Sequence, residues 1–190
     1  QARQQLILDL SRADVCDYII EAVSSVLRSA PISYVKWDMN RNMTEIGSAL
    51  LDSEHQGEVE HRYMLGLYRV LETITQSFPD VLFESCSGGG GRFDAGLLYY
   101  MPQTWTSDDT DAIERLKIQY STSMVYPISA IGSHVSAVPN HQTGRTTPMQ
   151  TRCDVAMSGN FGFELDLSKL SEDDMATAKK AVELCKRIRG

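Results

Sequence analysis

The sequence of 190 residues contains no long hydrophobic run and no cluster of basic residues. No segment approaches the roughly 20 consecutive apolar residues that a transmembrane helix needs, and the N-terminus lacks the pattern of a signal peptide. The 18 Lys and Arg residues are outnumbered by 25 Asp and Glu residues, which gives a formal net charge of -7. Because nucleic acids and anionic membranes are bound through basic surfaces, we expect neither as a partner. The sequence therefore predicts a soluble, cytoplasmic protein.

Cysteine is scarce, and the spacing of the cysteines excludes the common structural uses of this residue. Cys16, Cys86, Cys153 and Cys185 form no C-x-x-C pair and no Cys/His cluster with the spacing of a zinc site. Disulfides and structural zinc are therefore not expected, and a reducing compartment fits best. The sequence also lacks repeats, low-complexity segments and Pro/Gly-rich linkers, so residues 1–190 are expected to form a single segment of one domain.

Strand patterns and helix patterns alternate along the chain. The predicted strands cover residues 33–38, 81–86, 104–108, 124–131 and 161–165, with a weaker candidate at 6–10. The predicted helices cover residues 11–28, 58–77, 109–120, 147–159 and 171 onward. Ser11 is expected to cap the first helix, and Ser171 opens the last one, with acidic residues in its first turn and basic residues in its last. Apolar stripes are predicted on the first helix, at Val15, Tyr18, Ile19, Val23 and Val26, and on the second, at Val59, Tyr63, Leu67, Val70, Leu71 and Ile74. This alternation favours an α/β fold with parallel strands, namely a partial (β/α)8 TIM-type barrel. A whole barrel needs about 250 residues, so we expect the last five or six βα units; a small doubly wound sheet is the competing architecture.

Two aspartates stand where predicted strands end. Asp38 closes the string Y-V-K-W-D, and Asp108 closes Q-T-W-T-S-D. Side chains alternate along a strand, so Lys36 and Asp38 share one face and Trp37 lies on the other. A neighbouring cation keeps a carboxylate ionised, which suits a nucleophile; a structural salt bridge is the alternative. Two carboxylates at strand ends are what cleavage of a glycosidic bond requires.

Two further carboxylates, Asp109 and Asp111, follow Asp108. We assign these two to capping of the next helix, where aspartate is favourable. Asp108 lies nearest to the strand end and is therefore predicted to face the pocket. Crowding by like charges raises the pKa of a carboxyl group, as a general acid requires.

A glycine run follows the second predicted strand, at residues 88–91. Glycine lets the backbone approach a ligand closely, with amide groups free to donate, which suits a hydroxyl-rich ligand. A phosphate cradle is disfavoured because neither a G-K-[ST] nor a G-x-G-x-x-G frame is present. Cys86 precedes the run and is assigned to the pocket lining, because no histidine lies nearby in the sequence. His134 and His141 are assigned to polar turns without a catalytic role.

Four strings of the sequence together resemble bacterial α-galactosidases of glycoside hydrolase family 36. They are K-W-D-M-N-R at 36–41, F-E-S-C-S-G-G-G at 83–90, P-Q-T-W-T-S-D at 102–108 and G-S-H-V at 132–135. The resemblance extends over nearly the whole chain, in order and at natural spacing. It implies a retaining hydrolase of terminal α-D-galactosyl residues in melibiose- or raffinose-type sugars, built on a (β/α)8 barrel without a metal or cofactor.

The resemblance also implies roles for individual residues. Asp38 matches the nucleophile that forms the glycosyl-enzyme, and Asp108 matches the acid/base. Retention of configuration places two such carboxyl groups about 5 Å apart. The positions that match the galactose subsite, or border it, are Lys36, Cys86, Gly89 and Trp105.

Parts of the family pattern have no counterpart in this sequence. The family grips galactose with an aspartate pair and tryptophans that precede the position of Lys36, and it carries β-domains on both sides of the barrel. The chain begins at Gln1 without an initiator Met, so we expect a catalytic segment cut from a longer polypeptide. Two alternatives stay open. One is an incomplete barrel that binds carbohydrate or assembles, as a homo-oligomer or with a missing barrel segment. The other is a transglycosylase of the raffinose-forming type.

Overall fold

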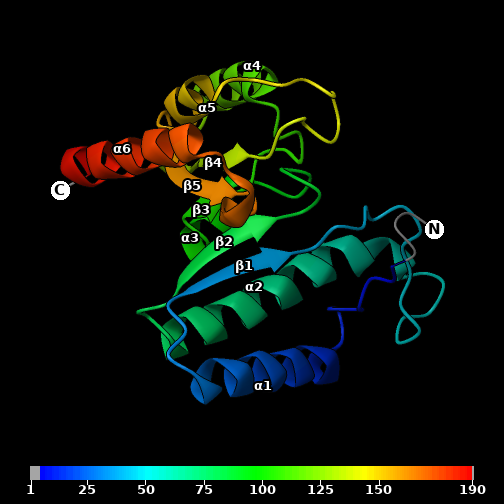
Figure 1. Cartoon of the computed structure of the whole chain (residues 1–190). Helices are drawn as coiled ribbons and strands as arrows, with labels where there is room; N and C mark the ends of the chain where they lie inside the picture. Colours follow the sequence, from blue (N-terminus) through cyan, green and yellow to red (C-terminus); the bar gives the residue numbers. More distant parts are fainter. Residues whose placement is uncertain (1–4, 190) are drawn as a thin grey trace. The chain divides into compact units, whose positions relative to one another are not determined.

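The computed structural model describes residues 5–189, which form two compact units (Figure 1). The first unit contains the described residues up to Ser87 together with Asp94–Pro102. The second contains Gly88–Phe93 and the described residues from Gln103 onward. The expectation drawn from Gln1 and its neighbours falls on residues 1–4, outside the described part of the chain. Within residues 5–189, no helix is both long enough and apolar enough to span a membrane.

The first unit packs helices against a pair of parallel strands. Its strands are β1 (Tyr34–Asp38) and β2 (Leu82–Cys86); its helices are α1 (Ala13–Ser29), α2 (Val59–Ser77) and α3 (Ala95–Tyr100), with a 3-10 turn at Gln56–Glu58. The strands run in register from the pair Tyr34 and Leu82 to the pair Asp38 and Cys86. Because the strands are parallel, both C-terminal ends lie at one edge of the unit, where Asp38 and Cys86 are neighbours.

The core of this unit confirms the stripe predicted for α2 and corrects the stripe predicted for α1. All six residues predicted to line the buried face of α2 are buried: Val59, Tyr63, Leu67, Val70, Leu71 and Ile74. In α1, Tyr18 is 70% exposed and Val26 is 58% exposed, so their assignment to the apolar stripe was wrong. The buried face of α1 is centred on Cys16 and Leu27. This face is rotated from the predicted stripe by about the angle that one residue adds around an α-helix.

The second unit repeats the strand–helix alternation. Its elements are β3 (Gln103–Thr104), α4 (Ala112–Ser123), β4 (Gly132–Ser136), α5 (Met149–Ala156), β5 (Asn160–Glu164) and α6 (Glu172–Ile188), with 3-10 turns at Ile128–Ala130 and Leu167–Lys169. Strands β4 and β5 pair in parallel, and Thr104 forms a parallel bridge with Ile131. The predicted α/β fold with parallel strands is therefore confirmed.

Several predicted elements differ from the structure. The strand predicted at 124–131 is a helix end followed by a 3-10 turn, and β4 begins at Gly132, where a polar turn was predicted. The polar residues of β4 are buried because they have partners: the Ser133 hydroxyl donates to Gln119 Oε1, and the Ser136 hydroxyl to Thr110 O, both at 2.8 Å. The strand predicted at 104–108 is short, residues 6–10 form no strand, and α3 was not predicted.

The capping predictions hold for α6 and fail for α1. Ser171 caps α6 by accepting from the amide of Asp174, with three acidic residues in the first turn and Lys186 and Arg187 in the last. Helix α1 begins after Arg12 without a side-chain cap, because the Ser11 hydroxyl instead donates to Asp9.

Candidate active site

Asp38 ends β1 and lies exposed at the C-terminal edge of the first unit. The Asn40 side-chain amide donates to Asp38 Oδ2 at 2.6 Å, so the loop after β1 braces the carboxylate. The Met39 amide donates to Cys86 O at 2.8 Å, which extends the pairing of β1 and β2 beyond the last strand residue. The Asp38 carboxylate is therefore presented at the end of a strand whose backbone is fixed on both sides of it.

Lys36 lies on the same face of β1 as Asp38 and opposite Glu84 in the register. Its Nζ is 3.6 Å from Glu84 Oε1, an ion pair with a carboxylate that has no exposed surface. The Tyr34 hydroxyl donates to the other oxygen of Glu84. Burial, together with this bond to Glu84, raises the pKa of Tyr34 above its ordinary value, so the phenol stays protonated and donates. The sequence predicted the strand face but missed Glu84.

Cys86 is 3% exposed and is the register partner of Asp38. Trp37 points to the opposite face of β1 and packs against the apolar core of the first unit, as predicted. Of the predicted site residues, the first unit therefore gathers Lys36, Asp38 and Cys86 at one strand edge.

Asp108 and Trp105 belong to the second unit, in the segment that follows β3. Trp105 is 2% exposed and contacts two side chains: the Arg115 guanidinium is 4.6 Å from its ring centroid, and the centroid of the His134 ring is 4.7 Å away. Asp108 is partly buried three residues further on. His134 was predicted in a turn; it lies in β4 and forms part of the surroundings of Trp105.

Arg115 fixes the segment before Asp108 from inside the second unit. This α4 residue is 2% exposed, and its guanidinium donates to Ser107 O at 3.1 Å and Gly132 O at 2.6 Å. Its Nε donates to Gln119 Oε1 at 3.0 Å. Arg115 therefore ties the residue next to Asp108 to the start of β4. Sequence reasoning missed it, because an arginine within a helix pattern is typical of a solvated face.

The glycine run packs against the same segment. Gly89 has a φ of +87°, and a Cβ at this position would lie 2.7 Å from the Cα of Ser107. The Gly90 amide donates to Thr106 O at 3.1 Å. One reason for glycine here is therefore the close approach of the chain's own backbone, beside the ligand approach that the sequence suggested. The second unit thus gathers Gly89, Trp105 and Asp108.

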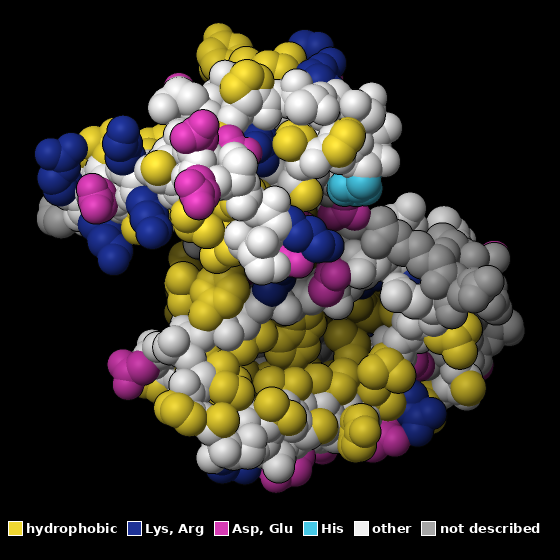
Figure 2. Space-filling model, viewed as in Figure 1, with side chains coloured by type: hydrophobic (Ala, Val, Ile, Leu, Met, Phe, Trp, Pro, Cys, Tyr) yellow, Lys and Arg dark blue, Asp and Glu magenta, His cyan; other side chains and the backbone are white. Residues whose placement is uncertain are grey.

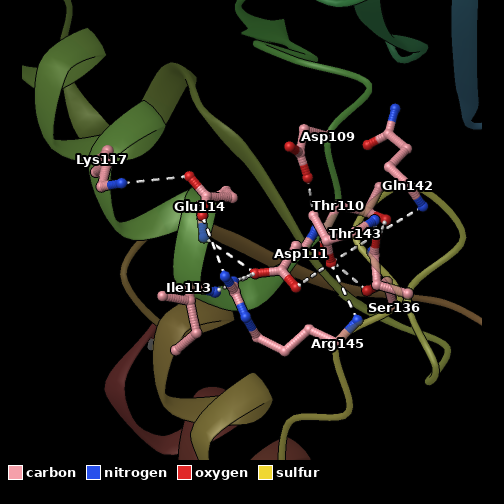
Figure 3. A network of polar contacts seen from close by, with 11 residues as sticks. Asp109, Thr110, Asp111, Ile113, Glu114, Lys117, Ser136, Gln142, Thr143 and Arg145 are labelled. Atoms are coloured by element: carbon pink, nitrogen blue, oxygen red, sulfur yellow. Dashed lines mark hydrogen bonds and ion pairs between the residues drawn. The ribbon is translucent and has the colours of Figure 1, made fainter.

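A network of polar side chains surrounds Asp111, the residue that caps α4 (Figure 3). Asp111 accepts from the amides of Ile113 and Glu114 at 2.9 and 3.1 Å, which confirms its predicted capping role. The Thr143 hydroxyl donates to Asp111 at 2.8 Å, and Arg145 forms an ion pair with it. Burial alone would raise the pKa of Asp111, but these hydrogen bonds hold it below its ordinary value.

The same network explains the neighbouring aspartate and the loop after β4. Asp109 does not cap α4; it accepts from the Asp111 amide at 3.0 Å in the preceding turn. Asn140, which is 3% exposed, donates to the Thr110 hydroxyl at 3.0 Å. The loop after β4 is thereby fastened to the turn that starts one residue after Asp108.

Metal ligation finds no support in the described side chains. Within residues 5–189, no group of three or more His, Cys, Asp or Glu side chains is arranged to hold a metal ion. All four cysteines are buried and carry free thiols.

Comparison with known proteins gives strong matches over the whole chain. The Melibiase family model matches residues 1–190. The sequence is 68% identical over 189 residues to α-galactosidase AgaA of Geobacillus stearothermophilus, covering 100% of this chain and 26% of AgaA. It is 53% identical over 188 residues to α-galactosidase Mel36A of Lactobacillus acidophilus, covering 99% of this chain and 26% of Mel36A.

Solved structures agree with these matches. The crystal structure of the GH36 α-galactosidase AgaA aligns with a TM-score of 0.96 at 68% identity, and covers 100% of this chain and 26% of that one. The α-galactosidase of Lactobacillus brevis aligns with a TM-score of 0.96 at 51% identity, covering 98% of this chain and 25% of that one. The chain spans about a quarter of the length of the relatives that it matches.

Proposed function

The chain belongs to the melibiase family, and we propose that it carries the two catalytic carboxylates of a retaining α-galactosidase. The observation that carries the proposal is Asp38, exposed at the end of β1 with Lys36 on its strand face and Cys86 beside it in the register. The substrates we propose are oligosaccharides with a terminal α-D-galactosyl residue. This choice is supported by a solved complex of an AgaA variant with raffinose and another with stachyose.

The proposed mechanism divides the reaction into two displacements. Asp38 attacks the anomeric carbon while Asp108 protonates the leaving oxygen, which gives a galactosyl-enzyme ester on Asp38. Asp108 then takes a proton from water, the water attacks the anomeric carbon, and the ester bond to Asp38 breaks. Two inversions give net retention. In this proposal Lys36, Cys86 and Gly89 line the galactose subsite, and Trp105 borders it.

The crystallised AgaA variants add support for these two aspartates. The variant solved with raffinose carries an aspartate-to-asparagine change, and the variant solved with stachyose carries an aspartate-to-alanine change. The two replaced aspartates are separated in the AgaA sequence by the same number of positions as Asp38 and Asp108 here. Replacement of a catalytic carboxylate is a common way to keep a substrate intact in a crystal.

We further propose that the two units are parts of one (β/α)8 barrel. The parallel pairings and the helix after each long strand support this architecture. Within residues 5–189, β1 pairs only with β2 and β5 only with β4, so each has an open edge. An apolar groove lies along each of these edges, formed by β1 with α1 and by β5 with α6. Figure 2 shows hydrophobic side chains gathered over the region of α1 and β1.

Grooves of this kind are what a neighbouring βα unit of the same barrel would cover. Light scattering by the isolated 190-residue chain tests the point. A stable monomer that binds no apolar dye would argue against incomplete edges, whereas association would support them. The cytoplasmic location stays a prediction, which fractionation of the source cells would check.

The decisive experiment replaces each aspartate in the native protein that carries these residues. Asp38→Gly and Asp108→Gly should each lower hydrolysis of an aryl α-galactoside by about 10²-fold or more. Azide should restore turnover in both, with different products. Without Asp38 a single displacement gives the β-galactosyl azide; without Asp108 two displacements give the α-galactosyl azide.

The matched control is Asp109→Gly, which removes a neighbouring carboxylate outside the proposed mechanism and should keep most of the activity. The same azide anomer from both variants would overturn the assignment of roles. Transfer of galactose to a sugar acceptor in place of hydrolysis would point to a transglycosylase.

A further inference from the structure

Glu84 is a carboxylate without exposed surface in the middle of β2. Burial of an ionised carboxylate is costly unless charges and hydrogen bonds compensate it. The proposed mechanism assigns no role to this residue. Tyr34 and Lys36, which both contact Glu84, come from the strand that ends in Asp38.

The geometry orders these groups along one strand face. Tyr34, Lys36 and Asp38 are two residues apart on β1 and share a face, and Glu84 is the register partner of the middle one. Tyr34 donates to one oxygen of Glu84 and thereby fixes its orientation. The other oxygen is 3.6 Å from Lys36 Nζ, a distance typical of an ion pair rather than a short hydrogen bond.

Lys36 can therefore be attracted by two carboxylates, one across the strand pair and one further along its own strand. Glu84 lies opposite it on β2, and Asp38 lies towards the exposed end of β1. A lysine drawn fully to Asp38 would neutralise the group that must attack the anomeric carbon. A lysine held by Glu84 keeps its ammonium back from the nucleophile and presents it to the sugar from a fixed position.

We infer that Glu84 is a positioning residue, which holds the Lys36 ammonium against β2 so that Asp38 stays available as the nucleophile. The inference rests on the proposed function, in which Lys36 contacts galactose and Asp38 attacks it. Glu84 acts only through Lys36 and touches no reacting atom.

A double-mutant cycle in the native protein tests this coupling. Glu84→Gln keeps the shape and an acceptor for Tyr34 but removes the charge, and should lower kcat/KM for an aryl α-galactoside by about 100-fold, because the ammonium is misplaced. Lys36→Met should cost at least as much. The double variant should equal Lys36→Met within about twofold, because Glu84 has nothing left to position.

The control is Tyr34→Phe, which removes the hydroxyl and keeps both charges; it should lower kcat/KM far less than Glu84→Gln. Should Glu84→Gln fail to fold, Glu84→Asp takes its place, since it keeps the charge but withdraws it by one methylene. Losses that multiply in the double variant would overturn the inference while leaving the proposed function intact. A folded native protein without galactosidase activity would overturn both.

Discussion

Arg115 offers the sharpest test of how the second unit holds the segment that leads to Asp108. Its guanidinium donates to Ser107 O, Gly132 O and Gln119 Oε1 from a position that is 2% exposed. We consider Arg115→Met, which keeps an unbranched chain out to about the position of Nε and removes every donor. Gln119 Oε1 keeps a second donor, the Ser133 hydroxyl. Most of the lost stability should therefore come from the hydrogen bonds to Ser107 O and Gly132 O.

The magnitude follows from these contacts. A buried acceptor left without its donor costs about 1–3 kcal/mol, and two carbonyls are affected here. The cation–π contact with Trp105, 4.6 Å from the ring centroid, adds about 0.5–2 kcal/mol. Methionine recovers part of the packing, so we expect Arg115→Met to lower the free energy of unfolding by about 3–5 kcal/mol. Loss of that size is a large part of the 5–15 kcal/mol typical of a domain.

Denaturant unfolding followed by tryptophan fluorescence measures this loss. The chain has two tryptophans, so a Trp37→Phe background isolates the signal of Trp105, directly beside Arg115. The matched control is Arg187→Met in the exposed last turn of α6, which should cost less than about 0.5 kcal/mol. A loss below about 1 kcal/mol for Arg115→Met, or one equal to the control, would refute the reasoning.

Two further predictions concern other sites. Gly66→Ala should destabilise the first unit by about 2–4 kcal/mol in thermal or denaturant unfolding, because the new Cβ would lie 1.9 Å from Leu10 O. This steric clash outweighs the roughly 1 kcal/mol by which alanine is favoured over glycine in a helix. Gly57→Ala, with nothing within 4 Å, is its control and should be near neutral. Asp111→Asn should reduce the acid sensitivity of stability. The pKa of Asp111 is lowered in the folded state, so its carboxylate stabilises the fold above the unfolded value, about 3.9, and loses this effect as pH falls towards the folded value. As the pH is lowered from 6 to 3, the free energy of unfolding should therefore fall more steeply in the wild type than in the variant. Parallel curves would contradict the lowered pKa of Asp111.

Sequence periodicity located most of the framework because the elements concerned obey simple burial rules. Helix α2 buries one stripe of its surface, and the six predicted residues were the right ones. The strand predicted in the region of β4 was placed too early in the sequence, because the residues of β4 include small polar ones. Burial of Ser133 and Ser136 depends on Gln119 and Thr110 from other parts of the chain. Helix α3 has only six residues and follows the glycine loop. A helix this short has no recognisable hydrophobic periodicity, so it was not predicted.

Part of the proposed site could likewise be predicted from the sequence, and part could not. The resemblance carried by the four sequence strings is confirmed by the match to the Melibiase model and by 68% identity to AgaA. The placement of Lys36 and Asp38 on one strand face follows from the two-residue period alone. Their neighbour Glu84 is 50 positions from Tyr34 in the sequence, and only the strand register brings the two together.

The residues that sequence reasoning missed share one physical property. Glu84 and Arg115 have the charge typical of surface residues in a strand and a helix, but both are buried. Asp111, whose capping role was predicted, is buried as well. Each costs free energy unless its partners are in place. Glu84 contacts Lys36 and Arg115 holds Ser107 beside Asp108, whereas Asp111 anchors the loop after β4. Buried charges beside functional residues are expected where the precise position of a side chain matters more than the stability of the fold. Buried charges that contact proposed site residues or their neighbours in the chain are therefore the feature that connects this fold to its proposed chemistry.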